Sequence, residues 1–245
     1  MHLLLLSNST SHDARPYSHA LSQIREFCGT GPIVFVPYAL ADYDAYTSHV
    51  ADALEGFKVR GLHHQGSPQL AVRDEDVILF VGGGNTFRLL KALQENDLVE
   101  PIRERIRNGG RYMGSSAGTV IVGPSIRTTN DMPIVEPHGF GAVGGVPFHF
   151  NCHYIDKDPA DTHMGESREL RLEQFHEENA SPVLAMREGA WLRVHDQHAT
   201  LGGDTGGRWF QAGQRPEDLV AGSDLSSLLM KPASTTSAQA STTAT

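Results

Sequence analysis

The sequence predicts an α/β protein built on a doubly wound, mostly parallel sheet. Short apolar runs at residues 3–6, 33–36 and 77–81 are typical of parallel strands that are covered on both faces. Amphipathic stretches of helical length at residues 17–27 and 43–54 lie between these runs. An alternation of buried strand and amphipathic helix is the pattern of an open sheet with helices on both sides.

The remaining elements follow from the same spacing arguments. Helices are expected at 87–93 and 99–106, then a strand at 109–113 and the start of a helix at 119–122. The rest are extended segments at 125–129 and 146–150, a polar loop at 159–165, a charged surface helix at 166–178, strands at 183–186, 190–194 and 208–212, and turns at 188–189 and 202–203. We expect one domain over residues 1–231 and a disordered Ser/Thr/Ala-rich tail over 232–245.

Composition and charge indicate which kinds of binding partner and which cellular compartment are expected for the protein. The chain has 245 residues, of which 39% are hydrophobic and 20% charged, as is ordinary for a soluble globular protein. A net charge of −9 argues against nucleic acid and against an anionic membrane as the main partner. With only two cysteines, Cys28 and Cys152, no disulfide framework is expected, and the reducing cytoplasm is the predicted location.

The N-terminal leucines could be mistaken for a targeting signal. The run at residues 3–6 has no basic flank and stops at Ser7 and Asn8 without a clear cleavage site. A buried first strand is therefore the better interpretation. No apolar run is long enough to span a bilayer.

The motif Gly-x-Ser-x-Gly at residues 114–118 carries the first sign of chemistry. It joins the strand expected at 109–113 to an apolar segment that can start a helix. A strand-to-helix turn exposes the hydroxyl of the central Ser116 and directs backbone N–H groups to where an oxyanion would form. The motif is common by chance, so it indicates a nucleophile only if the chain also supplies a base and an acid.

One histidine and two acids are candidates for these partners. Of the thirteen histidines, His153 ends an extended run that leads into a polar loop, and strand ends form the sites of α/β sheets. A surface histidine explains the pattern equally well. Asp131 would give the chain order Ser, Asp, His, and Glu188, at a turn after a strand, would give Ser, His, Glu. A plain turn residue is the simplest interpretation of either acid.

A glycine run at residues 82–84 follows the third strand and opens a helix. It lacks the Lys-Ser/Thr ending of a P-loop and the spacing of a dinucleotide fingerprint. We expect the N–H groups of Gly84 and Ala117 to form an oxyanion hole. A phosphate cradle and a purely structural tight turn are the alternatives.

Metal catalysis is the less favoured interpretation. His149 and His153 lie four residues apart, with His138 and His163 nearby, but no His-Glu-x-x-His occurs. We therefore expect neither a metal nor another cofactor.

Several longer segments, taken together, resemble the S51 family of serine peptidases, which includes alpha-aspartyl dipeptidases. The most specific of them is the run Ile-Arg-Thr-Thr-Asn-Asp-Met-Pro-Ile-Val at residues 126–135. The others, in family order, are residues 81–87, 114–118, 151–153, 165–169, 188–191 and 201–203. The resemblance extends from residue 1 to about Gly213. It departs from the family at Ser115, where many relatives have tryptophan.

The resemblance implies a flavodoxin-like α/β sandwich with a nucleophile elbow, similar to the class I glutamine amidotransferase domain. Ser116 would be the nucleophile, His153 the base and Glu188 the orienting acid. Asp131 would be the other charge-relay candidate, or a structural or substrate-site residue. The activity would be cleavage after an N-terminal aspartate, mostly in dipeptides and without a metal.

Recognition of the aspartyl side chain calls for a cation, and a guanidinium matches a carboxylate best. Arg168 and Arg127 are the candidates, since both lie in segments that match the family. A homodimer is a further expectation. The alternatives are a cyanophycinase-like or isoaspartyl-type serine hydrolase and a non-catalytic flavodoxin-like binding domain.

Overall fold

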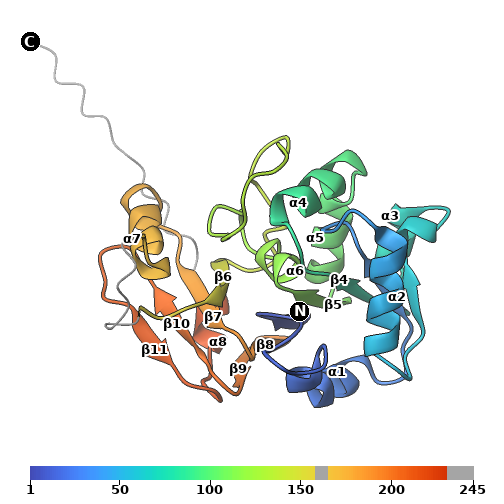
Figure 1. The fold of residues 1–245 in the computed structure, drawn as a ribbon, viewed down its shortest axis with the longest axis horizontal. Coiled ribbons are helices and arrows are strands. Elements are labelled where there is room, and N and C mark those ends of the chain that lie inside the picture. Colours follow the sequence, from blue (N-terminus) through green and yellow to red (C-terminus); the bar gives the residue numbers. More distant parts are fainter. Residues whose placement is uncertain (158–164, 231–245) are drawn as a thin grey trace, which may run out of the picture.

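The computed structural model describes residues 1–157 and 165–230, and its larger sheet has the strand order β3-β2-β4-β5-β1-β8-β9 (Figure 1). The first five strands in this order are parallel to one another, and β8 and β9 are antiparallel additions at one edge. In chain order the strands are β1 (His2–Leu6), β2 (Ile33–Val36), β3 (Val59–Gly61), β4 (Ile78–Val81), β5 (Arg111–Ser115), β8 (Ala190–His195) and β9 (His198–Gly203).

Alternating side chains of the buried strands enter two separate cores, one on each face of this sheet. Leu3 and Leu5 of β1 belong to one core, and Leu4 and Leu6 to the other. The first core is covered by α3 (Pro68–Arg73), α4 (Thr86–Glu95), α5 (Val99–Arg107) and α6 (Ala117–Val120), and the second by α1 (Leu21–Cys28) and α2 (Tyr43–Ala53). The predicted doubly wound α/β class is therefore confirmed.

A second sheet, of order β11-β10-β7-β6, lies beside the first (Figure 1). Its strands are β6 (His149–Tyr154), β7 (Val183–Arg187), β10 (Gly207–Phe210) and β11 (Glu217–Leu219). On one face it packs against α7 (Arg168–Glu178) through Leu172 and Phe175. On the other face Phe150, Leu184 and Trp209 join the first core, so the two sheets share apolar packing.

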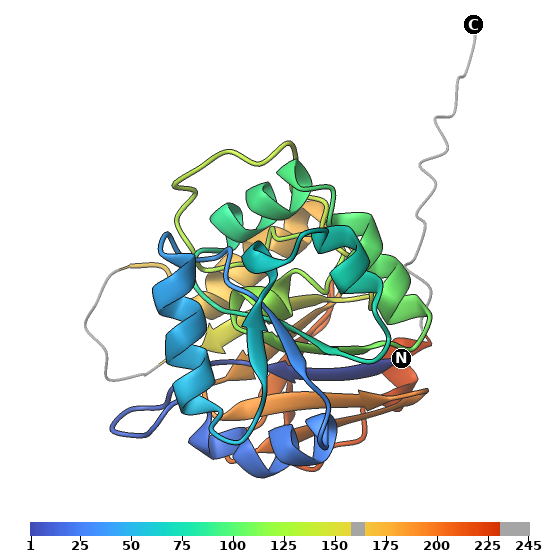
Figure 2. The same ribbon diagram turned by 90° about the vertical axis from the view of Figure 1, so that its right-hand side faces the viewer.

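Three short elements complete the fold of residues 1–157 and 165–230. They are the 3-10 turns η1 (Ser18–Ala20) and η2 (Leu62–His64) and the helix α8 (Ser226–Leu229). Figure 2 shows the parallel strands edge-on between helices, with the antiparallel strands below them. The predicted tail at 232–245 and most of the predicted loop at 159–165 lie outside the described residues. In the part that is described, no helix combines the length and the apolar character needed to cross a membrane.

Two sequence-based expectations are wrong. Gly202 and Gly203 end β9 rather than form a turn, and the ring of Trp191 occupies the space that a Cβ on Gly202 would need. Residues 125–129 are not a strand, apart from one bridge between Ser125 and Gly141. In this segment the Thr128 hydroxyl donates to the Phe150 carbonyl of β6. Such a side-chain interaction competes with strand pairing and cannot be inferred from an alternating pattern of apolar and polar residues.

Candidate active site

Ser116 lies at a sharp turn between β5 and α6. Its backbone has φ 50° and ψ −111°, a region that non-glycine residues rarely adopt. The turn is fixed by Ser116 N–H, which donates to the Leu6 carbonyl at 3.0 Å, and by the Thr119 hydroxyl, which donates to the same oxygen at 2.8 Å.

The two glycines of Gly-x-Ser-x-Gly make this turn sterically possible. A Cβ on Gly114 would lie 2.5 Å from the Gly118 carbonyl oxygen, and one on Gly118 would lie 2.1 Å from the Val81 oxygen. The backbone of the turn therefore packs directly against the neighbouring strand, and the sequence motif is a packing requirement of this elbow.

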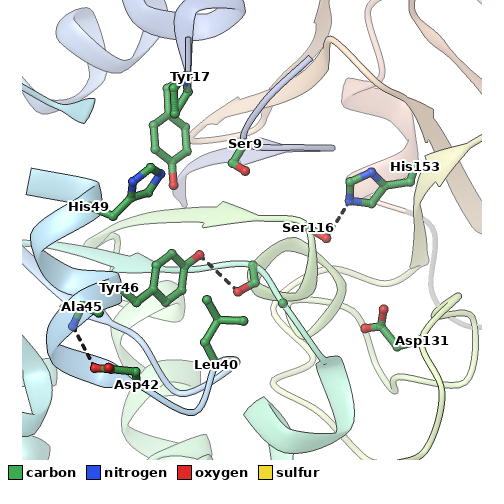
Figure 3. Close-up of a pocket in the computed structure, with 13 residues that line it drawn as sticks. Ser9, Tyr17, Leu40, Asp42, Ala45, Tyr46, His49, Ser116, Asp131 and His153 are labelled. Atoms are coloured by element: carbon green, nitrogen blue, oxygen red, sulfur yellow. Dashed lines mark hydrogen bonds between the residues drawn. The ribbon is translucent and has the colours of Figure 1, made fainter. Parts of the chain in front are cut away.

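His153 faces Ser116 from an irregular point in β6 (Figure 3). Its Nε2 lies 2.8 Å from Ser116 Oγ. The register of β6 against β7 shifts between Asn151 and Tyr154, and His153 has a positive φ of 55°. The buried Ser7 hydroxyl accepts the His153 N–H at 3.0 Å and donates to the Met186 carbonyl at 2.8 Å, so it ties this irregular point to the end of β1.

Glu188 completes a chain of hydrogen bonds. Its Oε1 lies 2.7 Å from His153 Nδ1, and the two side chains are 50% and 39% exposed. The turn that carries Glu188 is held at its backbone: Gly189 N–H donates to Asn8 Oδ1 at 2.9 Å, and the Thr205 hydroxyl donates to the Glu188 carbonyl at 2.7 Å. The predicted turn at residues 188–189 is thus in place and presents its carboxylate to the histidine.

Asp131 is directed to other partners. Its Oδ2 accepts hydrogen bonds from Thr86 N–H at 2.7 Å, the Thr86 hydroxyl at 2.5 Å and the Thr129 hydroxyl at 3.2 Å. These bonds satisfy donors at the start of α4. Of the two acid candidates, the structure brings Glu188 rather than Asp131 to His153.

The glycine run at residues 82–84 lies against the nucleophile. A Cβ on Gly83 would lie 3.1 Å from Ser116 Cβ, so only glycine allows this approach without displacement. Within the described part of the chain, no acceptor takes the N–H groups of Gly83, Gly84 or Ala117. The Tyr46 hydroxyl donates to the Gly83 carbonyl at 3.1 Å, and burial raises the pKa of Tyr46 to about 12, so this hydroxyl keeps its proton.

A pocket of about 720 Å³ opens over these groups (Figure 3). One wall contains Ser116, His153, Asp131, Gly83 and Gly84. The opposite wall comes from the N-terminal loop, the segment between β2 and α2, and α2 itself. It contains Ser9, Pro16, Tyr17, Leu40, Asp42, Ala45, Tyr46 and His49. Sequence reasoning missed this second wall, because nothing local marks its residues as neighbours of Ser116.

The two predicted arginines lie near the pocket but do not line it. The exposed Arg127 places its guanidinium 5.4 Å from the centre of the Phe140 ring and borders a second cavity of about 430 Å³. Arg171, which the sequence analysis missed, borders that cavity too, and Asp131 lines both cavities. The half-buried Arg168 begins α7; burial and the nearby Arg171 lower its pKa, and Asp131 opposes this shift.

The histidines of the metal alternative point to different partners. His149 is buried, its Nε2 lies 2.9 Å from Ser125 Oγ, and burial lowers its pKa to about 4. His153 instead faces Ser116 and Glu188, the exposed His138 lies in another loop, and His163 is outside the described residues. His149 and His153 therefore do not share a ligand set.

Comparisons with known proteins give a consistent picture. Residues 3–202 match the model described as "Peptidase family S51". The chain is 54% identical over 232 residues to "Peptidase E" of Streptomyces coelicolor, covering 94% of this chain and 95% of that protein. It is 45% identical over 235 residues to "Probable alpha-aspartyl dipeptidase" of Drosophila melanogaster, covering 94% and 98%.

Solved structures show the same fold. A putative peptidase E from Listeria monocytogenes EGD-e superposes with a TM-score of 0.62 at 22% identity, covering 83% of this chain and 98% of that one. A peptidase from an acI-B1 actinobacterium gives a TM-score of 0.61 at 17% identity, covering 91% and 96%.

Proposed function

The chain belongs to peptidase family S51, and from this premise we propose that Ser116, His153 and Glu188 are the catalytic triad of a serine-type alpha-aspartyl dipeptidase. Its reaction is hydrolysis of the peptide bond after an N-terminal aspartate. The observation that carries the proposal is the unbroken hydrogen-bond chain from Ser116 Oγ to His153 Nε2, at 2.8 Å, and from His153 Nδ1 to Glu188 Oε1, at 2.7 Å.

This chain of contacts suits acyl transfer. His153 Nε2 takes the Ser116 proton while Oγ bonds to the carbonyl carbon of the aspartyl residue. The protonated imidazole then gives that proton to the leaving amine as the C–N bond breaks. Water, deprotonated by the same imidazole, hydrolyses the acyl-enzyme and releases aspartate. Glu188 holds the tautomer with the proton on Nδ1 and stabilises the imidazolium.

Gly84 and Ala117 are the proposed oxyanion donors. The C=O and N–H of a trans peptide point in opposite directions, so the bond from Tyr46 to the Gly83 carbonyl turns the Gly84 N–H away from Tyr46. Ala117 follows the nucleophile and begins α6, where its N–H has no partner within the helix. Such fixed donors stabilise the charge that develops in the transition state.

We assign Asp131 to substrate binding rather than to the charge relay. Its negative charge lies at the boundary of the two cavities and suits the α-ammonium group of the substrate. The positive charges of Arg168 and Arg127, with Arg171 beside them, suit the aspartyl carboxylate. Asp131 would thus lie between the site that binds the substrate's α-ammonium group and the site that binds its side-chain carboxylate.

The alternative functions have less support. A non-catalytic binding domain would not need three side chains aligned at hydrogen-bond distances, two of them on strained backbone. The two relatives described above are named as a peptidase E and a probable alpha-aspartyl dipeptidase, not as cyanophycinases. The dipeptidase activity is therefore favoured over a cyanophycinase-like or isoaspartyl-type one.

A substrate panel tests the proposal. We expect hydrolysis of Asp-Leu and other Asp-X dipeptides, with Glu-Leu, Asn-Leu and β-linked Asp-Arg cleaved far more slowly. Ser116→Ala should lower kcat on the order of 10⁶-fold, because the nucleophile is lost. Ser115→Ala is the matched control: Ser115 is fully buried, its Oγ has no partner among the described residues, and its loss should leave most activity. Full activity of Ser116→Ala would refute the serine mechanism.

The oligomeric state and the compartment remain predictions. A homodimer is proposed, and light scattering of the purified chain measures it directly. The cytoplasmic location is proposed from the cysteines: Cys28 and Cys152 are both free and buried, as suits a reducing compartment.

A further inference from the structure

A group of two histidines and one aspartate lies outside the pocket, where η2 meets the first turn of α2. His63 Nε2 and His64 Nε2 lie 3.0 Å and 2.7 Å from the same oxygen, Asp44 Oδ1. Each of the three residues offers one ligand atom, and these ligand atoms all lie within 4.8 Å of one another. Two imidazoles therefore converge on one carboxylate oxygen.

We propose that Asp44, His63 and His64 bind a divalent transition-metal ion of the class that prefers imidazole, with Zn²⁺ as the representative. Imidazole nitrogen and carboxylate oxygen are both good zinc ligands, at bond lengths of about 2.0–2.2 Å. In tetrahedral geometry such ligand atoms lie about 3.3 Å apart. The separations of 2.7 Å and 3.0 Å need an expansion of only a few tenths of an ångström to accept the ion, and water would occupy the remaining coordination positions.

The ligands are partly held in place before an ion arrives. The His63 ring is only 13% exposed and packs against Tyr43, with the ring centres 5.6 Å apart. Gly61 leaves room for it, since a Cβ there would lie 2.3 Å from the ring. Asp44 is exposed, and one oxygen of its carboxylate lies within reach of both imidazoles.

Binding requires no net loss of protons. A neutral imidazole binds metal through the Nε2 lone pair once its proton has moved to Nδ1. His63 Nδ1 is buried without a hydrogen-bond partner among the described residues, so moving the proton there breaks no bond but leaves this N–H without an acceptor. The two hydrogen bonds to Asp44 are replaced by three coordination bonds to the ion.

The site would tie the η2 turn to the helix that forms one wall of the pocket. Asp44 is the second residue of α2, and Tyr46, which holds the Gly83 carbonyl, follows two residues later. The ion would therefore stabilise the fold and fix the start of α2. The proposed ion site and the proposed catalytic triad have no residue in common.

The test is Zn²⁺-dependent thermal stability of the EDTA-treated full chain. At about 100 times the Kd, we expect Zn²⁺ to raise Tm by about 5–10 °C, because the ion binds only the folded chain. Asp44→Asn and His64→Ala should each abolish most of this shift. Both residues are exposed, so the variants should fold. Co²⁺ should give a visible absorption band in the unmodified chain that Zn²⁺ displaces and that both variants lack.

The chain supplies its own control site. His2, His195 and Asp196 form the other group within ligand distance in the described residues. His195→Ala removes one ligand of that group and leaves Asp44, His63 and His64 intact, so it should keep the Zn²⁺ shift that these three produce. The proposal is overturned if Zn²⁺ leaves Tm of the unmodified chain unchanged, if Asp44→Asn and His64→Ala keep the full shift, or if His195→Ala removes it.

Discussion

The carboxylate that serves His153 can be identified by exchanging each acid for its amide. Glu188→Gln should lower kcat on the order of 10⁴-fold, because an amide can donate to Nδ1 and so favour the wrong tautomer. Asp131→Asn should mainly raise KM, about 10-fold or more, because it removes the charge proposed to bind the substrate ammonium. Steady-state kinetics with Asp-Leu separates the two effects.

A different kinetic result would show that Asp131, not Glu188 alone, acts in the charge relay. If Asp131→Asn lowers kcat as much as Glu188→Gln and leaves KM unchanged, Asp131 belongs to the charge relay. Circular dichroism on both variants controls for folding, which matters most for Asp131 because its carboxylate binds the start of α4.

At the scale of single residues, the candidate catalytic side chains could be predicted from the sequence, but the hydrogen bonds that position them could not. Ser116, His153 and Glu188 each lie at a strand end or turn, so their candidacy could be inferred from local context. The supporting roles of Ser7 and Asn8 could not, since each depends on a hydrogen bond to a residue more than 140 positions away. Whether Glu188 or Asp131 meets His153 is also decided by such long-range packing.

Among the elements, α2 has the clearest link to catalysis through Tyr46. Tyr46→Phe removes the hydrogen bond to the Gly83 carbonyl and keeps the ring that packs on Phe35 at 5.0 Å. We expect kcat to fall about 2- to 10-fold with little change in KM, because the peptide that carries the Gly84 N–H becomes less well fixed. Stopped-time assays with Asp-Leu at saturation provide the measurement.

Tyr43→Phe is the matched control for this prediction. Tyr43 lies on the same helix, packs on Tyr38 and does not line the pocket, so its variant should keep the kcat of the unmodified enzyme. An unchanged kcat in Tyr46→Phe, or an equal loss in both variants, would show that Tyr46 does not position the glycine run.

Elements with strong local patterns were predictable, and those that depend on distant partners were not. The run at 33–36 forms β2 with the same bounds, and the helix expected at 43–54 is α2 (Tyr43–Ala53). The short strands β3 and β11 have only three residues each, too few for a periodic signal. The irregular register of β6 that presents His153 comes from its pairing with β7, which the sequence of β6 alone does not specify.

For the whole molecule, the order of the sheets rests on contacts far apart in sequence. The doubly wound class followed from the alternation of apolar runs and amphipathic stretches in the first half of the chain. The second sheet did not, because β6 and β7 pair across the whole of α7. His149 lies in this region, buried at the start of β6 next to Phe175. The packing of the second sheet therefore determines how this histidine titrates in the folded chain.

Burial of neutral His149 should make the fold sensitive to mild acid. Burial lowers its pKa in the folded chain to about 4, and Arg127 and His176 act in the same direction, whereas the nearby Pro182 carbonyl opposes the shift. In the unfolded chain the pKa is about 6.5. As pH falls from 6.5 to 4, only the unfolded chain takes up this proton, so the free energy of unfolding decreases, by about 3 kcal/mol at the limit.

His149→Gln removes this titration and keeps a polar group near Ser125. Its free energy of unfolding at pH 7 should be lower than that of the unmodified chain, but its further loss between pH 6.5 and 4 should be smaller by up to about 3 kcal/mol. Urea unfolding at several pH values measures both quantities. His12→Gln, which replaces a histidine whose side chain is 94% exposed, is the control. If the His149→Gln curve runs parallel to that of the unmodified chain over this range, acid sensitivity arises elsewhere, because all other titrating groups are shared.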